Sequence, residues 1–313
     1  MAVRDTLLVA GSANVDFVVR ASHVPAPGET VLGRDFAVFT GGKGANQAVA
    51  SARAGAVPTR MLVALGDDAF AALLQRSLED ANVSLQVVRS VKPTGTAFVC
   101  LADDADNAIT VAPGANGDLQ GDEVSDWTRI GYVLLQLETP LEAVRALAGA
   151  ARTGGARVVL NAAPARALPA DLLELVDVLV VNEGELAILT GGSDVADSLA
   201  RLQVPCVVVT LGARGCCARS DGKVLLQPGF KVQAVDTTAA GDTFCGVLGA
   251  ALNVGLPLAE ALRLASAASA LACTRLGAQA SIPSHAEVED LLRTAACGQA
   301  ADTRELAAYC GLV

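Results

Sequence analysis

Residues 235–244 of the chain read Val-Asp-Thr-Thr-Ala-Ala-Gly-Asp-Thr-Phe. Small, flexible residues lead into an apolar helical run that starts near Gly241. The first turn of a helix leaves several backbone N–H groups unpaired, and together with the helix dipole they attract an anion. Because Ala239, Ala240 and Gly241 carry minimal side chains, a phosphate can come close to this backbone. We therefore expect an anion hole at residues 239–241.

Asp242 places a carboxylate directly beside this expected anion hole. A carboxylate repels a phosphate, so the role that fits is a base that takes a proton from an attacking hydroxyl. The alternative is that Asp242 caps the helix, since Asp is a favoured N-cap residue. The motif alone favours capping, whereas the rest of the chain favours catalysis.

Length and composition restrict the possible classes of protein. The chain has 313 residues, of which 52% are apolar and only 3% aromatic, so Ala, Val and Leu must fill the core. This length suits one large α/β domain or two domains. The most apolar region, 244–258, is interrupted by Asn253 and Pro257 and is too short for a membrane span. The N-terminus leads straight into a strand and a glycine turn, which is not typical of a signal peptide.

The cysteine pattern and the net charge limit the kinds of metal, ligand and partner that the protein is expected to bind. The eight cysteines form no C-x-x-C pair and only two His are present, so we expect no zinc site. Cysteines without framework spacing favour a reducing cytoplasm. The formal charge of −10 argues against nucleic-acid binding. We therefore expect a cytoplasmic protein whose partners are small molecules, not nucleic acid or membrane.

Strand and helix signals alternate along most of the chain, which predicts βαβ units and a mainly parallel sheet. The expected strands are 7–10, 60–64, 132–137, 157–160, 178–181 and 206–210, and the helices between them are 45–54, 69–80, 141–152, 183–190 and 194–202. Such sheets bind ligands at the carboxyl ends of their strands. That rule places six residues near one rim: Asn14, Gln136, Glu138, Asn182, Thr210 and Gly212.

Two segments break the alternation. Residues 15–21 and 30–39 resemble one strand pair, and residues 96–102 and 108–111 resemble another, turned by an acidic stretch at 103–107. They predict a small separate sheet, which beside a ligand cleft would act as a lid; the alternative is extra strands on the main sheet. We expect a single α/β domain over 1–313, with lid strands inserted at about 15–39 and 96–111. Residues 295–313 form an Ala-rich tail of no clear role.

A glycine-rich stretch at 40–47 surrounds Lys43 just before a helix. The glycines permit close backbone approach to a ligand, while Lys43 and Asn46 supply donors. The stretch is not a Walker A loop, because Gly44 follows the lysine, nor a dinucleotide fingerprint, because Gln47 stands where a third glycine is needed. Upstream, Asn14 and Asp16 can face one pocket from an extended chain and suit sugar hydroxyls. The alternatives are a tight turn at 40–47 and a polar turn at 11–16.

Three further motifs follow strands. Residues 136–138 end one strand, and Asn182 ends another. Glu183 and Glu185 could cap the next helix or organise Mg²⁺ through water. The loop 210–215 is suited to lie along a nucleotide. Capping or turn formation is the alternative for each motif, but their position on one rim favours a ligand site.

These motifs together resemble the ribokinase family, within the wider group of sugar kinases that includes the minor phosphofructokinase and adenosine kinase. The resemblance runs from about residue 7 to 292. Its most specific parts are 41–48, 136–138, 161–164 and 235–244, and the stretches 27–30 and 277–279 point to ribokinases within the group. It implies a three-layer α/β/α fold, with a mainly parallel central sheet and a small inserted β-sheet lid.

The resemblance also implies roles for individual residues. The sugar would be held by Asn14, Asp16, Gly42, Lys43, Asn46 and Glu138, with Asp242 as the catalytic base. ATP would be bound by Asn182, Thr210, Gly212, Arg214, Gly215, Gly241 and Ser266, and its transferred phosphate by the anion hole Ala239, Ala240 and Gly241. A monovalent cation, usually K⁺, would be held mostly by backbone carbonyls of Asp236, Thr238, Ala272, Arg275, Gly277 and Ser281.

Three positions depart from the family pattern. Ser266 stands where His or Asn is common beside the adenine, Val181 where Pro is usual, and Thr238 where an aliphatic residue is usual. The first departure puts the adenine contacts in question. For Thr238 only the backbone carbonyl is expected to matter.

The implied activity is ATP-dependent phosphorylation of the O5 hydroxyl of D-ribose, with Mg²⁺ on the nucleotide and K⁺ as activator. The implied assembly is a homodimer through the lid sheet. Alternatives within the fold are kinases for deoxyribose, another sugar or a nucleoside. From other classes, an oxidoreductase is opposed by the missing G-x-G-x-x-G, and a non-catalytic sugar-binding protein by the intact Gly241 and Asp242.

Overall fold

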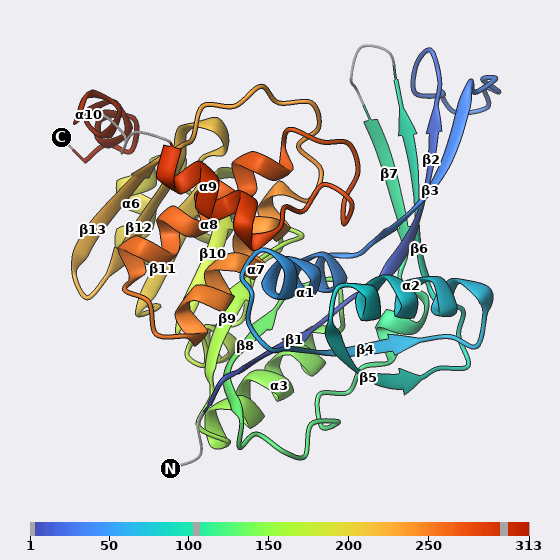
Figure 1. Ribbon diagram of the computed structural model, residues 1–313, viewed down its shortest axis with the longest axis horizontal. Helices are drawn as coiled ribbons and strands as arrows, with labels where there is room; N and C mark the ends of the chain where they lie inside the picture. Colours follow the sequence, from blue (N-terminus) through green and yellow to red (C-terminus); the bar gives the residue numbers. More distant parts are fainter. Residues whose placement is uncertain (1–3, 103–106, 295–299, 313) are drawn as a thin grey trace.

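A mainly parallel sheet forms the centre of the molecule (Figure 1). The computed structural model describes residues 4–102, 107–294 and 300–312. Over these residues nine strands pair in the order β13-β12-β11-β10-β9-β8-β1-β4-β5. Their bounds are β1 Thr6–Ala10, β4 Thr59–Leu65, β5 Val83–Arg89, β8 Ile130–Leu135, β9 Arg157–Asn161, β10 Val178–Asn182, β11 Cys206–Thr210, β12 Gly215–Ser220 and β13 Lys223–Pro228. Among the described strands of this sheet, antiparallel pairing occurs only at one edge, where β12 pairs with both β11 and β13.

The predicted alternation of strands and helices is confirmed, but three strands lay outside it. The six expected strands are all present, with ends shifted by at most two residues. The pattern missed β5, β12 and β13, which run beside the outer edges of the sheet. Edge strands are half solvated and carry polar residues such as Gln86 and Arg219, so their apolar signal is weak.

Helices cover both faces of this sheet, and the alternation of side chains along each strand explains why. In β1, Leu7 and Val9 join one core layer while Leu8 and Ala10 join the other. One layer is covered by α1 Lys43–Arg53, α2 Ala69–Asp80, α7 Ala240–Asn253, α8 Leu258–Ala272 and α9 His285–Thr294. The other is covered by α3 Leu141–Thr153, α4 Ala170–Leu173, α5 Glu183–Thr190, α6 Val195–Arg201 and α10 Ala300–Tyr309. The predicted three-layer fold is confirmed.

A second sheet stands apart from the main one (Figure 1). Four strands of the described chain form it in the order β3-β2-β6-β7. They are β2 Asn14–Arg20, β3 Asp35–Gly41, β6 Gly95–Leu101 and β7 Asn107–Ala112. Both expected strand pairs are present, although residues 30–34 precede the strand, and the acidic turn at 103–106 lies outside the described residues. The alternative of extra strands on the main sheet is wrong.

The strand order places one region of the sheet where a ligand site is expected. Strand β1 lies between β4 and β8. The strand order runs from β1 to β4 and β5 on one side, and to β8 and β9 on the other side. The carboxyl ends of β1 and β8 therefore open a crevice at this switch point. Ser12 follows β1 and Glu138 follows β8, so segments 126 residues apart meet there.

Helices α1 and α7 pack closely beside this crevice. A Cβ atom on Gly246 of α7 would lie 2.4 Å from the carbonyl oxygen of Gln47 and 2.7 Å from the Cβ of Ala50. Only glycine permits this approach, since real contacts are longer. The contact brings Gln47 and Ala50 of α1 against the second turn of α7.

The variant Gly246→Ala should separate α1 from α7 and lower the free energy of unfolding by about 1–3 kcal/mol, the usual cost of overpacking. The matched control is Gly149→Ala in α3, where nothing lies within 4 Å of the added Cβ. That variant should gain about 0.5–1 kcal/mol from helix propensity. Urea unfolding measures both, and equal effects would contradict close packing at Gly246.

Candidate active site

The start of α7 has the geometry that an anion requires. Ala239 precedes the helix in the left-handed conformation, with φ of 58°. The N–H of Ala240 donates to Thr237 and that of Thr243 to Ala239. Within the described residues, the N–H groups of Gly241 and Asp242 between them have no acceptor. The expected helix start is confirmed, and its free N–H groups suit an anion.

Asp242 is held between two amides of α1. Its Oδ2 accepts from Nδ2 of Asn46 at 2.9 Å, and its Oδ1 from Nε2 of Gln47 at 3.0 Å. The side chain is only 8% exposed. The N-cap position is Ala239, so the alternative of a capping role for Asp242 is wrong. The carboxylate is instead aimed at the crevice.

Gln47 is itself locked in a buried network. Its Oε1 accepts from Nε2 of Gln136 at 2.7 Å, and its Nε2 also donates to Oδ1 of Asn161 at 3.1 Å. Gln136 follows β8 and Asn161 ends β9. Sequence reasoning gave no role to Gln47 or Asn161, although both lie in family motifs. Their role depends on contacts over more than 80 residues.

The predicted sugar residues gather around one cavity. It has a volume of about 350 Å³ and is lined by all seven of them: Asn14, Asp16, Gly42, Lys43, Asn46, Glu138 and Asp242. Its other wall is the inner face of the lid, with Val18, Phe39 and Val99. Gly42 has φ of 90°, and a Cβ there would lie 2.7 Å from Cα of Ala13, so glycine alone lets this loop reach the cavity.

Two residues that the sequence did not reveal orient the cavity wall. Nδ2 of Asn116 donates to Oδ1 of Asn14 at 2.8 Å. Oγ of Ser12 donates to Oε2 of Glu138 at 2.5 Å, and the N–H of Lys43 donates to the same oxygen at 3.0 Å. Asn116 lies in a short 3₁₀ helix, Gly114–Asp118, that carries no motif, so no local signal could have revealed it.

Charges in the cavity are strongly coupled. Burial, followed by the neighbouring Glu138 and Asp242, raises the pKa of Asp16 to about 7. The charge of Asp242, followed by that of Glu138, raises the pKa of Lys43, and burial opposes this rise. Lys43 therefore remains an ammonium group among three carboxyl groups. The arrangement can bind hydroxyl groups as donors and as acceptors.

A second cavity lies on the other side of the α7 start. It has a volume of about 430 Å³ and contains five predicted nucleotide residues, namely Thr210, Gly212, Gly215, Gly241 and Ser266. Phe230, Val232 and Ala270 supply an apolar wall. Ser266 is buried, and its hydroxyl lies 3.8 Å from the thiol of Cys216. The cavity suits a flat ring with a phosphate chain directed at α7.

Two predicted nucleotide residues are placed differently. Asn182 caps α5, because its Oδ1 accepts from the N–H of Glu185 at 2.8 Å, and the N–H of Asn182 donates to Oε2 of Glu185 at 2.7 Å. Arg214 turns away from the second cavity and stacks on Tyr309. Of the two glutamates considered for Mg²⁺, Glu185 is buried and coupled to Lys43 and Asp242, whereas Glu183 bonds Tyr309.

The predicted cation residues come from two neighbouring loops. Oδ1 of Asp236 accepts from the N–H of Thr238 at 2.8 Å, and its Oδ2 accepts from the N–H of Gly277 at 2.9 Å. Burial alone would raise the pKa of Asp236, but these bonds lower it. The carbonyl of Ala272 accepts from the N–H of Arg275, and the Ser281 hydroxyl donates to Ala278. The part of the chain described here contains no cluster of three or more metal-ligating side chains.

Comparison with known proteins identifies this arrangement. The model of the pfkB carbohydrate kinase family matches residues 4–285. The chain belongs to this family. Ribokinase of Haemophilus influenzae is 38% identical over 308 residues, covering 94% of this chain and all of the relative. Ribokinase of Bacillus subtilis is 37% identical, covering 91% of this chain and 99% of the relative.

Solved structures of this pfkB family agree with the fold. The structure of Arabidopsis thaliana ribokinase complexed with ribose and ATP has a TM-score of 0.86 at 34% identity, covering 94% of this chain and all of that one. Thermotoga maritima ribokinase has a TM-score of 0.85 at 35% identity with the same coverage. The resemblance to the ribokinase family and its fold is confirmed.

Removing the Gln47 amide should misdirect Asp242 without removing it. For Gln47→Met, of similar length but apolar, we expect kcat to fall about 10²-fold, the scale of a misplaced reacting group. The KM for the sugar should change much less. Steady-state kinetics give both values, and the melting temperature shows whether the variant is folded. An unchanged kcat would contradict a positioning role for Gln47.

Proposed function

We propose that this pfkB-family protein transfers the γ-phosphate of ATP to the O5 hydroxyl of D-ribose, giving D-ribose 5-phosphate and ADP. The observation that carries the proposal is the position of the α7 start between two cavities. Asp242 and Ala239 line the cavity with hydroxyl-binding side chains, and Ala240 and Gly241 line the other. Phosphoryl transfer needs this arrangement, with acceptor and donor meeting at one anion hole. The curated relatives described above are named ribokinases.

The reaction follows from the contacts. Asn14, Asp16 and Glu138 hold the sugar hydroxyls, and Asn46 and Gln47 aim the Asp242 carboxylate at O5. Asp242 accepts the O5 proton while the oxygen attacks the γ-phosphorus. The bond from phosphorus to the β,γ-bridging oxygen breaks, and ADP leaves with its electrons. The free N–H groups at the α7 start stabilise the charge on the transferred group.

The lid supplies the apolar cover of the sugar cavity. Val18, Phe39 and Val99 face the cavity from three lid strands. A lid that moves toward the sugar would exclude water, so that ATP is not hydrolysed instead.

The donors available fit both expected cations. Mg²⁺ on the nucleotide phosphates would neutralise their charge. We expect Glu185, which is coupled to Lys43 and Asp242, to hold it through water, as Mg²⁺ usually keeps several waters. The loops at 236–238 and 272–277, tied together by Asp236, would hold K⁺ mainly by carbonyls. A set of neutral carbonyl donors suits a large, weakly hydrated cation.

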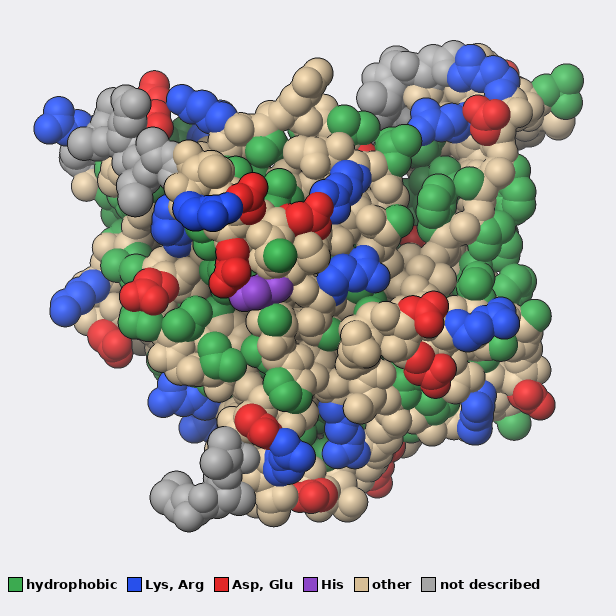
Figure 2. Space-filling model, viewed as in Figure 1, with side chains coloured by type: hydrophobic (Ala, Val, Ile, Leu, Met, Phe, Trp, Pro, Cys, Tyr) green, Lys and Arg blue, Asp and Glu red, His purple; other side chains and the backbone are tan. Residues whose placement is uncertain are grey.

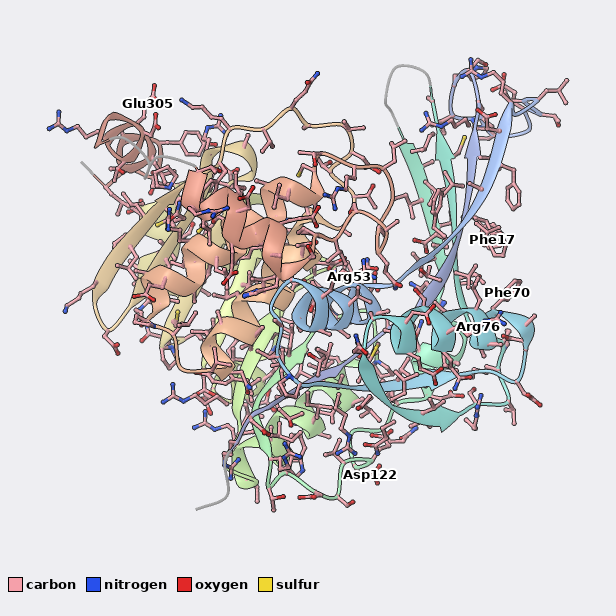
Figure 3. All side chains as sticks on the ribbon, viewed as in Figure 1. Phe17, Arg53, Phe70, Arg76, Asp122 and Glu305 are labelled. Atoms are coloured by element: carbon pink, nitrogen blue, oxygen red, sulfur yellow. The ribbon has the colours of Figure 1, made fainter. Side chains whose placement is uncertain are left out.

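We also propose a homodimer through the outer face of the lid. Alternate residues of β2, β3 and β6 leave Phe36 64% and Phe98 55% exposed, and Phe17 stacks between them at 6.2 and 5.4 Å. Figure 2 shows hydrophobic side chains gathered along the lid at the right of the view, and Figure 3 places Phe17 beside Phe70 of α2. A patch of this kind marks an interface. A monomeric mass in solution would contradict this assembly.

We place the enzyme in the cytoplasm. The seven cysteines of the described chain are all free thiols, which fits a reducing compartment. Every helix in the described ranges is too short or too polar to span a bilayer.

The substrate assignment is tested by turnover with ATP and Mg²⁺ on ribose, deoxyribose, fructose and adenosine, each with and without K⁺. We expect the highest kcat/KM on ribose, and an increase with K⁺. Faster turnover of another acceptor would contradict the choice of ribose while leaving the Asp242 chemistry intact. Binding of ribose without turnover would favour the alternative of a non-catalytic sugar-binding protein.

The variant Asp242→Asn keeps the size and shape of the side chain but removes the carboxylate that is proposed to act as the base. We expect kcat to fall by about 10²–10⁴-fold, the usual contribution of general-base catalysis. Ribose binding, measured by calorimetry, should persist because the other cavity residues are unchanged. Near-normal turnover would exclude Asp242 as the base.

Asp16 should make the reaction sensitive to pH near neutrality. A carboxylate accepts sugar hydroxyls more strongly than a carboxylic acid, and its pKa is about 7, so kcat/KM for ribose should fall as the pH drops through 7. Asp16→Asn should be less active but lack this limb of the pH profile.

The raised pKa of Asp16 also makes the stability of the fold depend on pH. The folded protein binds the Asp16 proton more tightly than the unfolded chain, so ionisation destabilises the fold between about pH 4 and pH 7. Without sugar, Asp16→Asn should therefore raise the melting temperature more at pH 8 than at pH 5. An equal change at both values would contradict the raised pKa.

A further inference from the structure

The C-terminal helix α10 lies outside the part of the chain that the family model matches. That match ends at residue 285, whereas α10 runs Ala300–Tyr309. In Figure 1 the helix lies beside β13, at the end of the sheet opposite the lid. The sequence assigned no role to this tail.

The helix is anchored as a core element. Leu306 is 3% exposed and Cys310 fully buried, and both join the apolar layer that contains Cys217 of β12. The N–H of Ala196 in α6 donates to the carbonyl of Cys310 at 3.1 Å. Burying an aliphatic side chain stabilises a protein more than most surface contacts do. The helix α10 therefore has a defined position on the sheet.

From this position, Tyr309 contacts the loop that lines the nucleotide cavity and also the first residue of α5. The guanidinium carbon of Arg214 lies 4.0 Å from the centre of the Tyr309 ring, a cation–π contact. The Tyr309 hydroxyl donates to Oε1 of Glu183 at 2.6 Å. Arg214 belongs to the loop between β11 and β12, and Glu183 begins α5. A weaker ion pair, 3.8 Å long, joins Asp302 to Lys231.

The loop held by Tyr309 is one wall of the nucleotide cavity. Gly212, Ala213 and Gly215 line that cavity, while Arg214 between them points to the opposite side. There it borders another cavity, of about 410 Å³, whose far wall is formed by four residues of α10, namely Asp302, Glu305, Leu306 and Tyr309. Figure 3 labels Glu305 on this helix. The loop therefore separates the two spaces.

Such a loop is flexible unless it is supported. Gly212 and Gly215 both have positive φ, at 58° and 108°, and flank the short 3₁₀ turn that carries Arg214. Ordering a glycine-rich loop on ligand binding costs conformational entropy, and a contact that orders it beforehand strengthens binding. The C-terminal helix can order this loop through its contact with the Arg214 side chain.

We propose that Tyr309 is a positioning residue for ATP: it stacks on Arg214, fixes the 212–215 loop in its nucleotide-ready form and so makes the C-terminal helix part of the nucleotide site. This inference rests on the proposed function in taking ATP as the nucleotide. It assigns Arg214 an indirect role, through the tail, in place of direct contact with the nucleotide.

The test compares Tyr309→Ala with Tyr309→Phe. Tyr309 is 43% exposed, so neither variant should disturb the core. Loss of an exposed cation–π contact corresponds to about a two- to five-fold rise in the KM for ATP in Tyr309→Ala. Tyr309→Phe keeps the ring and should show a smaller rise. The KM for ribose should stay unchanged in both.

Arg304→Ala, at an exposed position of the same helix, is the matched control and should leave both KM values unchanged. The double variant Arg214→Ala/Tyr309→Ala should be no worse than Arg214→Ala alone, because the two residues act as a unit. Additive effects would overturn the proposal. So would an unchanged or lowered KM for ATP in Tyr309→Ala, the lowered value meaning that the tail withholds Arg214 from the nucleotide.

Titration with a fluorescent ADP analogue separates this inference from the proposed function. It needs no sugar and no turnover. Weaker analogue binding in Tyr309→Ala would support the positioning role even if ribose proved to be the wrong acceptor. Absence of analogue binding to the wild-type protein would contradict the proposed function itself.

Discussion

The structure depends on a buried carboxylate held between two helices. The proposed role of Asp242 as a base requires a charged carboxylate, and a buried charge without partners costs several kcal/mol. Asn46 and Gln47 supply one amide donor to each of its oxygens. That geometry requires α1 and α7 to approach as closely as Gly246 allows. The same approach places the α7 N-terminus between the two cavities, so base and anion hole share one support.

Around this centre, charge and apolar surface are separated. The floor of the sugar cavity brings Asp16 and Glu138 close to Asp242, with Lys43 among them. Such a group of carboxylates is tolerable because the ammonium group compensates part of the charge and because one carboxyl readily holds a proton. The lid adds only apolar contacts from Val18 and its neighbours. In the proposed reaction, specificity for hydroxyl groups comes from the floor, and exclusion of water from the cover.

The nucleotide side is built differently. Its wall is a glycine-rich loop, which gains close approach to the ligand at the expense of rigidity. The core of the fold supports this loop from the sheet, and α10 contacts it from outside through Arg214 and Tyr309. A helix outside the range matched by the family model thus contacts a glycine-rich loop inside that range.

The sequence by itself determined the α/β alternation, the helix start near Gly241 and the glycine-rich motif around Lys43, because strand periodicity, helix initiation and glycine content are local properties. It also predicted both lid strand pairs. It could not assign Gln47 and Asn116, whose partners are more than 80 residues away, nor show that Arg214 leaves the nucleotide cavity for Tyr309. Only the tertiary structure decided these points, since a side chain's role follows from its spatial neighbours, which depend on how distant strands and helices pack.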